Sequence, residues 1–259
     1  MASTLFDMTN KVVLITGSSK GIGRAIAQEM ARAGAKVVIS SRKGDVCEAV
    51  AGEINAACAG QPGGAVAIPA HIGDKAALEL LVAQTREQLG PIDVLVCNAA
   101  VNPFFGASKD IPDSAFQKIL NINILSNHWL CHMVLPEMVE RQDGSVIIVS
   151  SIGGLRGSTD LGGYAISKAA DVQLVRNLAA EYGPYNIRVN AVSPGLVRTD
   201  FARALWENPE TLARRTQNDP LRRIGEPEEL AGIAVYLGSK AGSFTTGQNF
   251  VIDGGATSV

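Results

Sequence analysis

Seven short β-branched runs alternate with longer segments of helical periodicity, and this alternation constrains the fold of the chain most. The runs that predict strands are Val12–Thr16, Val37–Ser40, Val66–Pro69, Val94–Cys97, Val146–Ser150, Arg188–Val192 and Asn249–Ile252. The segments that predict helices are Ile22–Ala33, Asp45–Ala59, Asp74–Leu89, Asp113–Arg141, Tyr164–Glu181 and Pro227–Leu237. Such an alternation predicts an α/β chain with a doubly wound, seven-stranded parallel sheet and helices on both faces. Ligands of such sheets bind beyond the carboxyl ends of the strands.

Length and composition favour a single globular domain over residues 1–259. Hydrophobic residues make up 46% of the chain, charged residues 19%, and the net charge is -2, which gives no electrostatic reason to expect a nucleic-acid partner. The segment 196–226 has no strand pattern and is long enough to be a lid over a substrate site.

Targeting and metal signals are not evident in the sequence. No uncharged apolar run approaches the roughly 20 residues of a membrane span, and the first ten residues do not resemble a secretory signal, so we expect a cytoplasmic protein with no membrane partner. We expect no metal site either, because the cysteines and histidines lack metal-ligand spacing. They are Cys47, Cys58, Cys97 and Cys131, and His71, His128 and His132.

A glycine-rich run follows the first predicted strand, where the chain should turn into a helix. In this G-x-x-x-G-x-G pattern, Gly17 would allow a sharp turn, Gly21 a close approach of a pyrophosphate, and Gly23 tight helix packing. The amide groups and dipole of the helix would face the phosphates. Glycine turns also serve plain connections, so the pattern predicts a dinucleotide site chiefly because of its position.

The end of the second predicted strand indicates which dinucleotide is bound. A side chain that binds a free ribose 2′-hydroxyl at this position would be acidic, but the residues here are Ser41 and Arg42. Lys20 and Arg42 can converge on a 2′-phosphate, which favours NADP(H) over NAD(H). The alternative is that both are solvated surface charges.

Tyr164 and Lys168 are four residues apart and therefore share one face of a helix. An ammonium beneath the phenol favours the phenolate, and together with an oxidised nicotinamide it is expected to lower the pKa of Tyr164 from its usual value of about 10. The pair therefore predicts a proton carrier.

Two further polar residues complete a candidate catalytic set. Ser151 follows a predicted strand and can hold a substrate carbonyl, on whose oxygen hydride addition builds negative charge. Asn123, within the long helix Asp113–Arg141, is expected to bend that helix through a local hydrogen bond and to hold water for a proton relay. Taken singly, each residue has an ordinary structural reading, and only their combination indicates catalysis.

These motifs resemble the classical short-chain dehydrogenase/reductases over essentially the whole chain. The matching residues are Gly17-x-x-x-Gly21-x-Gly23, Asn98-Ala99-Ala100, Asn123, Ser151, Tyr164-x-x-x-Lys168 and Pro194-Gly195-x-x-x-Thr199. The resemblance implies a single-domain Rossmann fold, a homotetramer, and an oxidoreductase that transfers hydride between NADP(H) and a carbonyl or secondary alcohol.

The resemblance also implies roles for individual residues. Tyr164 would be the acid/base, Lys168 would lower its pKa and bind the nicotinamide ribose, Ser151 would orient the substrate, and Asn123 would join the proton relay. The residues expected to bind the cofactor are Gly17, Ser19, Lys20, Gly21, Ile22, Gly23, Ser41, Arg42, Ile72, Asn98, Ala99, Ala100, Tyr164, Lys168, Pro194, Gly195, Val197 and Thr199.

Two positions depart from the family pattern. Ala100 stands where a glycine is common and adds a methyl group near the cofactor, a change that we expect to be tolerated. His71-Ile72 replaces an acidic residue near the adenine, so the contact to the adenine amino group must differ or come from the backbone.

The substrate site resembles the NADP-dependent retinol dehydrogenase/carbonyl reductase branch, which reduces apolar ketones and aldehydes. This likeness lies in Asn98–Gly106 and in Leu205-Trp206. We expect an apolar pocket with few polar groups, unless these residues serve core or subunit packing. The candidate lining residues are Phe104, Phe105, Leu155, Leu161, Phe201, Leu205 and Trp206.

Other functions remain open at this point. A 3-oxoacyl-(acyl-carrier-protein) or acetoacetyl-CoA reductase is the near alternative, in which Arg203, Arg214 and Arg215 would receive the carrier, although a solvated charge run is the simpler reading. A regulator that senses NADP without turnover would not need Ser151 and Tyr164 together with Lys168. A scaffold that uses the sheet only for assembly would need none of them.

Overall fold

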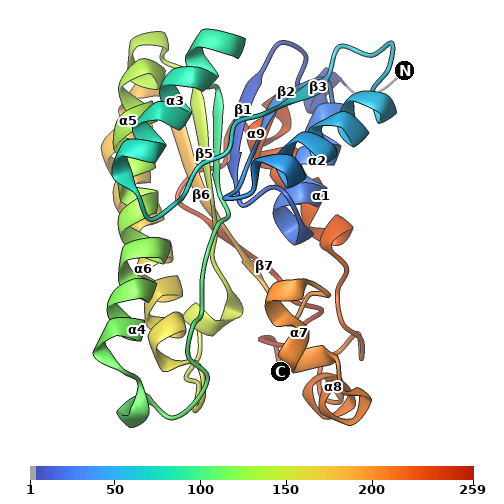
Figure 1. Cartoon of the computed structure of the whole chain (residues 1–259), viewed down its shortest axis with the longest axis vertical. Helices are drawn as coiled ribbons and strands as arrows, with labels where there is room; N and C mark the ends of the chain where they lie inside the picture. Colours follow the sequence, from blue (N-terminus) through green and yellow to red (C-terminus); the bar gives the residue numbers. More distant parts are fainter. Residues whose placement is uncertain (1–3) are drawn as a thin grey trace.

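The structure, a computed structural model, describes residues 4–259, and within this range seven strands form one parallel sheet (Figure 1). The strands are β1 (Val12–Thr16), β2 (Lys36–Ser40), β3 (Gly64–Ala67), β4 (Val94–Cys97), β5 (Gly144–Val149), β6 (Ile187–Pro194) and β7 (Asn249–Ile252). Their order is β3-β2-β1-β4-β5-β6-β7, which confirms the predicted doubly wound fold. The strand order reverses between β1 and β4, so this is the switch point at which ligands bind.

Helices cover both faces of the sheet (Figure 1). On one face lie α1 (Gly21–Arg32), α2 (Gly44–Ala57) and α9 (Ala231–Gly238); on the other lie α3 (Lys75–Leu89), α5 (Ser126–Arg141) and α6 (Gly162–Tyr182). Strand β1 shows why two cores form. Its side chains alternate between the faces, so Val13 and Ile15 join the first core while Val12 and Leu14 join the second.

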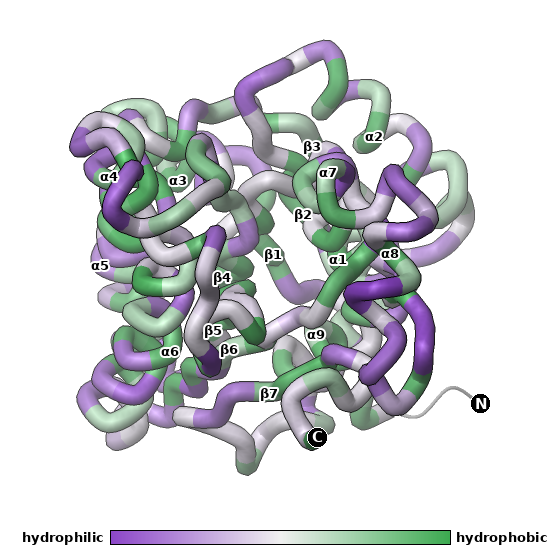
Figure 2. The backbone as a smooth tube through the Cα atoms, turned by 90° about the horizontal axis from the view of Figure 1, so that it is seen from below, coloured by the Kyte–Doolittle hydropathy of each residue, from purple (hydrophilic) through white to green (hydrophobic). Residues whose placement is uncertain are grey.

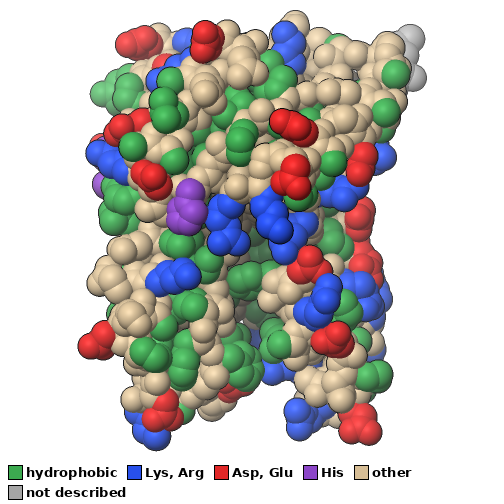
Figure 3. Space-filling model, viewed as in Figure 1, with side chains coloured by type: hydrophobic (Ala, Val, Ile, Leu, Met, Phe, Trp, Pro, Cys, Tyr) green, Lys and Arg blue, Asp and Glu red, His purple; other side chains and the backbone are tan. Residues whose placement is uncertain are grey.

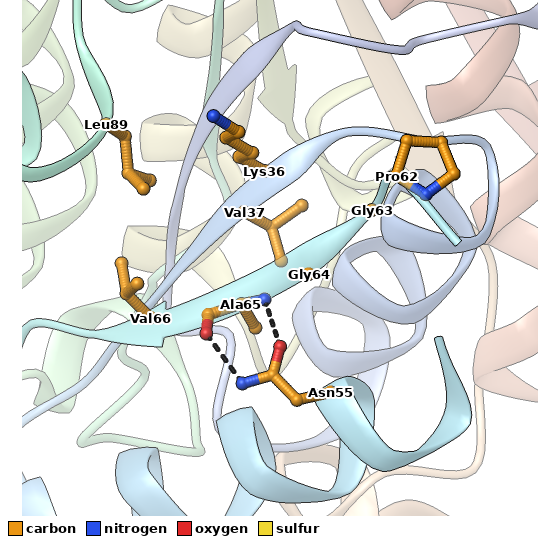
Figure 4. Close-up of a pocket in the computed structure, with 9 residues that line it drawn as sticks. All are labelled: Lys36, Val37, Asn55, Pro62, Gly63, Gly64, Ala65, Val66 and Leu89. Atoms are coloured by element: carbon orange, nitrogen blue, oxygen red, sulfur yellow. Dashed lines mark hydrogen bonds between the residues drawn. The ribbon is translucent and has the colours of Figure 1, made fainter. Parts of the chain in front are cut away.

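The edge strand β3 begins and ends earlier than the sequence predicts. The predicted strand was Val66–Pro69, but pairing with β2 matches Lys36 to Gly64 and Ile39 to Ala67. On the open side of β3, Asn55 of α2 accepts a hydrogen bond from Ala65 N at 2.7 Å and donates one to Ala65 O at 2.9 Å (Figure 4). The amide of Asn55 therefore satisfies backbone groups that an edge strand would otherwise leave open to another chain.

The long predicted helix Asp113–Arg141 forms over its whole length, but it is not α-helical throughout. It consists of α4 (Asp113–Ile119), a π-helical segment over Leu120–Leu125, and α5. A π-helical turn inside an α-helix shifts the residues that follow it and is frequent at functional sites. Asn123 lies in this segment and is fully buried.

The segment 196–226 contains the short helices α7 (Arg203–Trp206) and α8 (Pro209–Thr216), beyond the carboxyl ends of the strands (Figure 1). A β-bridge between Val197 and Gly225 joins the two ends of the segment. Arg198 N donates to Gly225 O at 2.9 Å, and Gly225 N donates to Leu196 O at 3.0 Å. Among the described residues, no helix is both long and apolar enough to cross a membrane.

Candidate active site

A cavity of about 1090 Å³ opens at the carboxyl ends of the central strands. Figure 3 shows the hollow between the two lower lobes of the molecule, and Figure 2 shows the same end from below. The wall of this cavity includes all the predicted cofactor-binding residues except Gly23. These are Gly17, Ser19, Lys20, Gly21, Ile22, Ser41, Arg42, Ile72, Asn98, Ala99, Ala100, Tyr164, Lys168, Pro194, Gly195, Val197 and Thr199.

The glycine loop forms a cradle at one end of this cavity. Gly17 and Gly21 have positive φ angles of 66° and 55°, which L side chains rarely adopt. Helix α1 begins at Gly21, and no side chain caps its first amide groups. These free donors and the helix dipole fit a pyrophosphate, so the loop suits a bound dinucleotide.

Gly23 lies beneath the loop and allows β4 to approach it. A Cβ atom at Gly23 would lie 2.4 Å from Asn98 Nδ2 and 2.6 Å from Gly17 O. Asn98 Nδ2 itself donates to Thr16 O at 2.9 Å and to Gly17 O at 3.1 Å. Asn98 thus ties β4 to the glycine loop, and the missing side chain of Gly23 makes room for this contact.

The cationic residues at the mouth of the cavity differ in their partners. Arg42 is exposed and lines the cavity with the neighbouring Lys43, which the sequence reasoning missed. Lys20 forms an ion pair with Asp200 of the segment 196–226, with 3.3 Å between Nζ and Oδ2. This ion pair links the glycine loop to the predicted lid, and because both side chains are largely exposed, the role of Lys20 at the cofactor stays a prediction.

His71 and Ile72 both line the cavity, where the sequence departs from the family pattern. His71 Nδ1 accepts a hydrogen bond from Gly73 N at 3.2 Å, so the ring is held by its own turn. His71 lies beyond the end of β3 at Ala67.

Ser151, Tyr164 and Lys168 meet on the cavity wall, on the β5–α6 connection and the first turns of α6. Ser151 Oγ accepts a hydrogen bond from Gly153 N at 3.0 Å, and its hydroxyl group faces the Tyr164 phenol, whose pKa it lowers. Lys168 Nζ lies 5.8 Å from the centre of the Tyr164 ring. The ring of Phe201, from the segment 196–226, lies 5.8 Å from the Tyr164 ring in a tilted arrangement.

In the protein itself the pKa of Tyr164 is raised, so Lys168 alone does not produce the predicted lowering, which also depends on an oxidised nicotinamide. Burial raises the pKa of this phenol above its ordinary value, while Lys168 and the Ser151 hydroxyl act in the opposite direction without overcoming burial. The ammonium therefore compensates for burial, and any further lowering needs another positive charge in the cavity.

Lys168 has a partner that the sequence reasoning missed. Its Nζ donates to Val149 O at 2.8 Å and to Asp171 Oδ2 at 2.9 Å. Burial lowers the pKa of Lys168, but the carboxylate of Asp171 and the phenol of Tyr164 raise it above its ordinary value overall. A single aspartate within a predicted helix gives no signal of this contact, because it is typical of a solvated surface position.

Asn123 does not line the cavity, and its side chain does not bend the helix through a local hydrogen bond as predicted. Its Oδ1 accepts from Val101 N at 2.8 Å, and its Nδ2 donates to Val101 O at 3.0 Å and to Ser167 Oγ at 3.0 Å. It thereby joins the π-helical segment to the loop after β4 and to α6. Its carbonyl accepts from Asn127 Nδ2 at 2.7 Å. A water-holding role for Asn123 stays a prediction.

The substrate end of the cavity is partly apolar. Of the seven predicted lining residues, Phe105, Leu161, Phe201 and Leu205 are present, while Phe104, Leu155 and Trp206 are not. Trp206 donates from Nε1 to Thr199 O at 2.9 Å, which fixes its ring within the lid segment. The expectation of few polar groups is wrong, because charged side chains also line this end. They are Arg156, Asp160, Arg215 and Asp219.

Comparison with known proteins agrees with this geometry. The family model described as "Enoyl-(Acyl carrier protein) reductase" matches residues 17–257. Dehydrogenase/reductase SDR family member 4 of Bos taurus is 42% identical over 251 residues, covering 97% of this chain and 88% of the relative.

Two solved structures share the fold at comparable similarity. The putative NAD(P)-dependent gluconate 5-dehydrogenase of Beutenbergia cavernae with bound NADP has a TM-score of 0.92 and 31% identity, covering 98% of this chain and all of that chain (100%). A 7α-hydroxysteroid dehydrogenase in complex with NADH and 7-oxo glycochenodeoxycholic acid has a TM-score of 0.92 and 33% identity, covering 98% and 97% of the two chains. The family model and the relative match this chain along nearly its full length, and Ser151, Tyr164 and Lys168 meet in one cavity with the glycine loop. The chain therefore belongs to the short-chain dehydrogenase/reductase family of NAD(P)-dependent oxidoreductases.

Proposed function

We propose that this enzyme uses NADP(H) to interconvert ketones or aldehydes with their alcohols, with a preference for largely apolar substrates. The single observation that carries the proposal is that Ser151, Tyr164 and Lys168 meet in one cavity with the glycine loop. The apolar part of the substrate would lie against Phe105, Phe201 and their neighbours.

Ser151, Tyr164 and Lys168 each have a separate role in the proposed reaction. When bound, the reduced nicotinamide supplies the hydride. Ser151 donates its hydroxyl hydrogen to the carbonyl oxygen, where negative charge develops, and Tyr164 transfers a proton to the same oxygen. Lys168 stabilises the phenolate that remains. Phe201, whose ring contacts Tyr164, helps to exclude water from this side chain when a substrate is bound.

The preference for NADP(H) is supported by the positive charge around the end of β2. Arg42 and Lys43 are both exposed at the cavity mouth, and Lys20 lies on its rim. A 2′-phosphate fits these donors better than a free hydroxyl would. Comparing the Michaelis constants for NADPH and NADH tests this part of the proposal, and a clear preference for NADH contradicts it.

The same geometry also supports an acyl-thioester substrate as a second candidate. Arg156 and Arg215 line the substrate end, where a phosphate of a pantetheine arm would find cationic groups. Both have acidic neighbours, since Arg215 lies 3.9 Å from Asp160 and Arg156 faces Asp219. Burial raises the pKa of Asp219 above its ordinary value, and Arg156 opposes this effect only in part. This partial compensation of charge favours the smaller, uncharged substrates. The homotetramer and the cytoplasmic location stay predictions.

The Tyr164→Phe variant tests the proposed chemistry. It removes the proton donor but keeps the ring, so NADPH binding, followed by quenching of protein fluorescence, is expected to remain. Turnover of the aromatic ketones, diketones or acetoacetyl thioesters accepted by the wild type is expected to fall by about 10²–10⁴-fold. A near-normal rate in this variant contradicts the mechanism, and a preference for the thioesters in the wild type favours the second candidate.

A further inference from the structure

A buried ion pair lies directly behind the proposed proton donor. The side chains of Lys168 and Asp171, one turn apart on α6, join at 2.9 Å, and the two residues are 1% and 0% exposed. An ammonium group has three N–H donors, of which Asp171 and Val149 O take two. These two inner acceptors fix the direction of the third N–H. Because Lys168 lines the cavity, this remaining donor is available to a ligand there.

Asp171 is itself held from a second helix. Its Oδ1 accepts a hydrogen bond from Asn127 Nδ2 of α5 at 3.0 Å, so both of its carboxylate oxygens are occupied. The same amide of Asn127 donates to Asn123 O in the π-helical segment. The backbone of α6 is fixed as well, because Ser150 Oγ of the β5–α6 connection donates to Lys168 O at 2.7 Å. The Asp171 carboxylate therefore cannot shift without breaking its hydrogen bonds with Lys168 and with Asn127 of α5.

No other anion lies against the Lys168 ammonium among the described residues. The groups that face it are Tyr164, Asp171 and the buried thiol of Cys97, which lies next to Cys131. A hydrogen bond with Cys131, together with burial, raises the pKa of Cys97 well above its ordinary value, so this thiol stays neutral. An ammonium buried without a counter-charge would lose its proton readily. Asp171 is thus the group that keeps Lys168 charged.

Buried ion pairs are poor sources of stability, because removing two charges from water offsets their attraction. The position of this pair is better explained by its effect on the reaction. We propose that Asp171 is a positioning residue that holds the Lys168 ammonium against the inner wall and keeps it charged while Tyr164 exchanges its proton. This inference rests on the proposed function, in which Tyr164 and Lys168 act as a pair.

The proposal makes a specific statement about pH. Tyr164 and Lys168 are close enough for the loss of the first proton to belong to the pair. The carboxylate of Asp171 disfavours this loss, whichever of the two groups releases the proton. Ketone reduction needs the phenol and the ammonium intact, so Asp171 extends the reduction activity to higher pH.

The first experiment is the pH profile of NADPH-dependent reduction in the Asp171→Asn and Asp171→Glu variants. Asp171→Asn keeps the size of the side chain but removes its charge, so the alkaline limb of kcat/KM should move to lower pH by about one unit or more. Asp171→Glu keeps the charge and should retain the limb near its wild-type position. A limb that does not move in Asp171→Asn means that the residue is only structural and overturns the proposal.

The second experiment measures thermal unfolding and needs no turnover, so it separates this proposal from the proposed function. Lys168→Met leaves the Asp171 carboxylate buried without its partner, and its Tm should lie below that of the wild type. The double variant Lys168→Met/Asp171→Asn buries no unpaired charge, and its Tm should exceed that of Lys168→Met alone. A double variant that melts no higher than Lys168→Met shows that Asp171 does not act on the charge of Lys168, and this too overturns the proposal.

Discussion

The Gly23→Ala variant is expected to destabilise the protein even though alanine favours helices. The new Cβ would lie 2.4 Å from Asn98 Nδ2 and 2.6 Å from Gly17 O, both too close for a carbon atom. Moving the Asn98 amide away breaks two hydrogen bonds that contribute about 1 kcal/mol each, and the remaining overlap costs about 1–3 kcal/mol. The higher helix propensity of alanine relative to glycine offsets about 1 kcal/mol of this loss. The net loss in the free energy of unfolding is therefore about 2–4 kcal/mol.

Gly52 provides a matched control, because it lies in the interior of helix α2 and a Cβ there meets nothing within 4 Å. Gly52→Ala should raise the free energy of unfolding by about 0.5–1 kcal/mol. Urea denaturation of both variants gives the comparison, and titration with NADPH should also show weaker binding in Gly23→Ala, since the displaced Asn98 supports the glycine loop. If Gly23→Ala is as stable as Gly52→Ala, the close packing of Asn98 against α1 is not the constraint described above.

Two further variants test electrostatic contacts. The pKa of Glu229 is lowered from 4.5 to about 2 by hydrogen bonds from Arg223 and from the Glu226 amide, so its stabilising effect is complete above pH 4.5 and is lost as the pH falls toward 2. Glu229→Gln should therefore show a smaller change in the free energy of unfolding over this range than the wild type, and an equal change in urea titrations contradicts this. Asp200→Asn releases Lys20 from its ion pair and should tighten NADPH binding by up to about fivefold while NADH binding changes little, as measured by fluorescence titration. Weaker NADPH binding in Asp200→Asn contradicts the proposed contact of Lys20 with the 2′-phosphate.

The strands and most helices could be predicted because their signals are local. Runs such as Val12–Thr16 and Val94–Cys97 match the structure at both ends, since apolar β-branched residues in a central strand are buried on both faces. The edge strand β3 was misplaced because its ends are set by pairing with β2 and not by its own residues. The π-helical segment was missed because a helical pattern continues across Leu120–Leu125 and does not reveal one extra residue in a turn.

The candidate site was predictable to the extent that its residues lie in short motifs. The glycine loop and the Tyr164–Lys168 pair are each contained within a few residues, so their spacing carries the information. Asp171 and Asn127 form their contacts across two helices, and nothing in the spacing of either residue indicates a partner. The charged residues at the substrate end could not be predicted for the same reason, because Arg156 lies in the β5–α6 connection and Arg215 in α8, and only the fold brings them together.

The bridge between Val197 and Gly225 has a consequence for how new activities arise on this scaffold. Because the two ends of the intervening stretch are fastened to each other, its length and composition can change at little cost to the sheet, as loop closure depends only weakly on length. We therefore expect the segment between Val197 and Gly225 to be exchangeable as a unit. Transplanting the corresponding residues from a relative with another substrate, with Thr199 and Phe201 retained beside the cofactor site and Tyr164, should then alter selectivity.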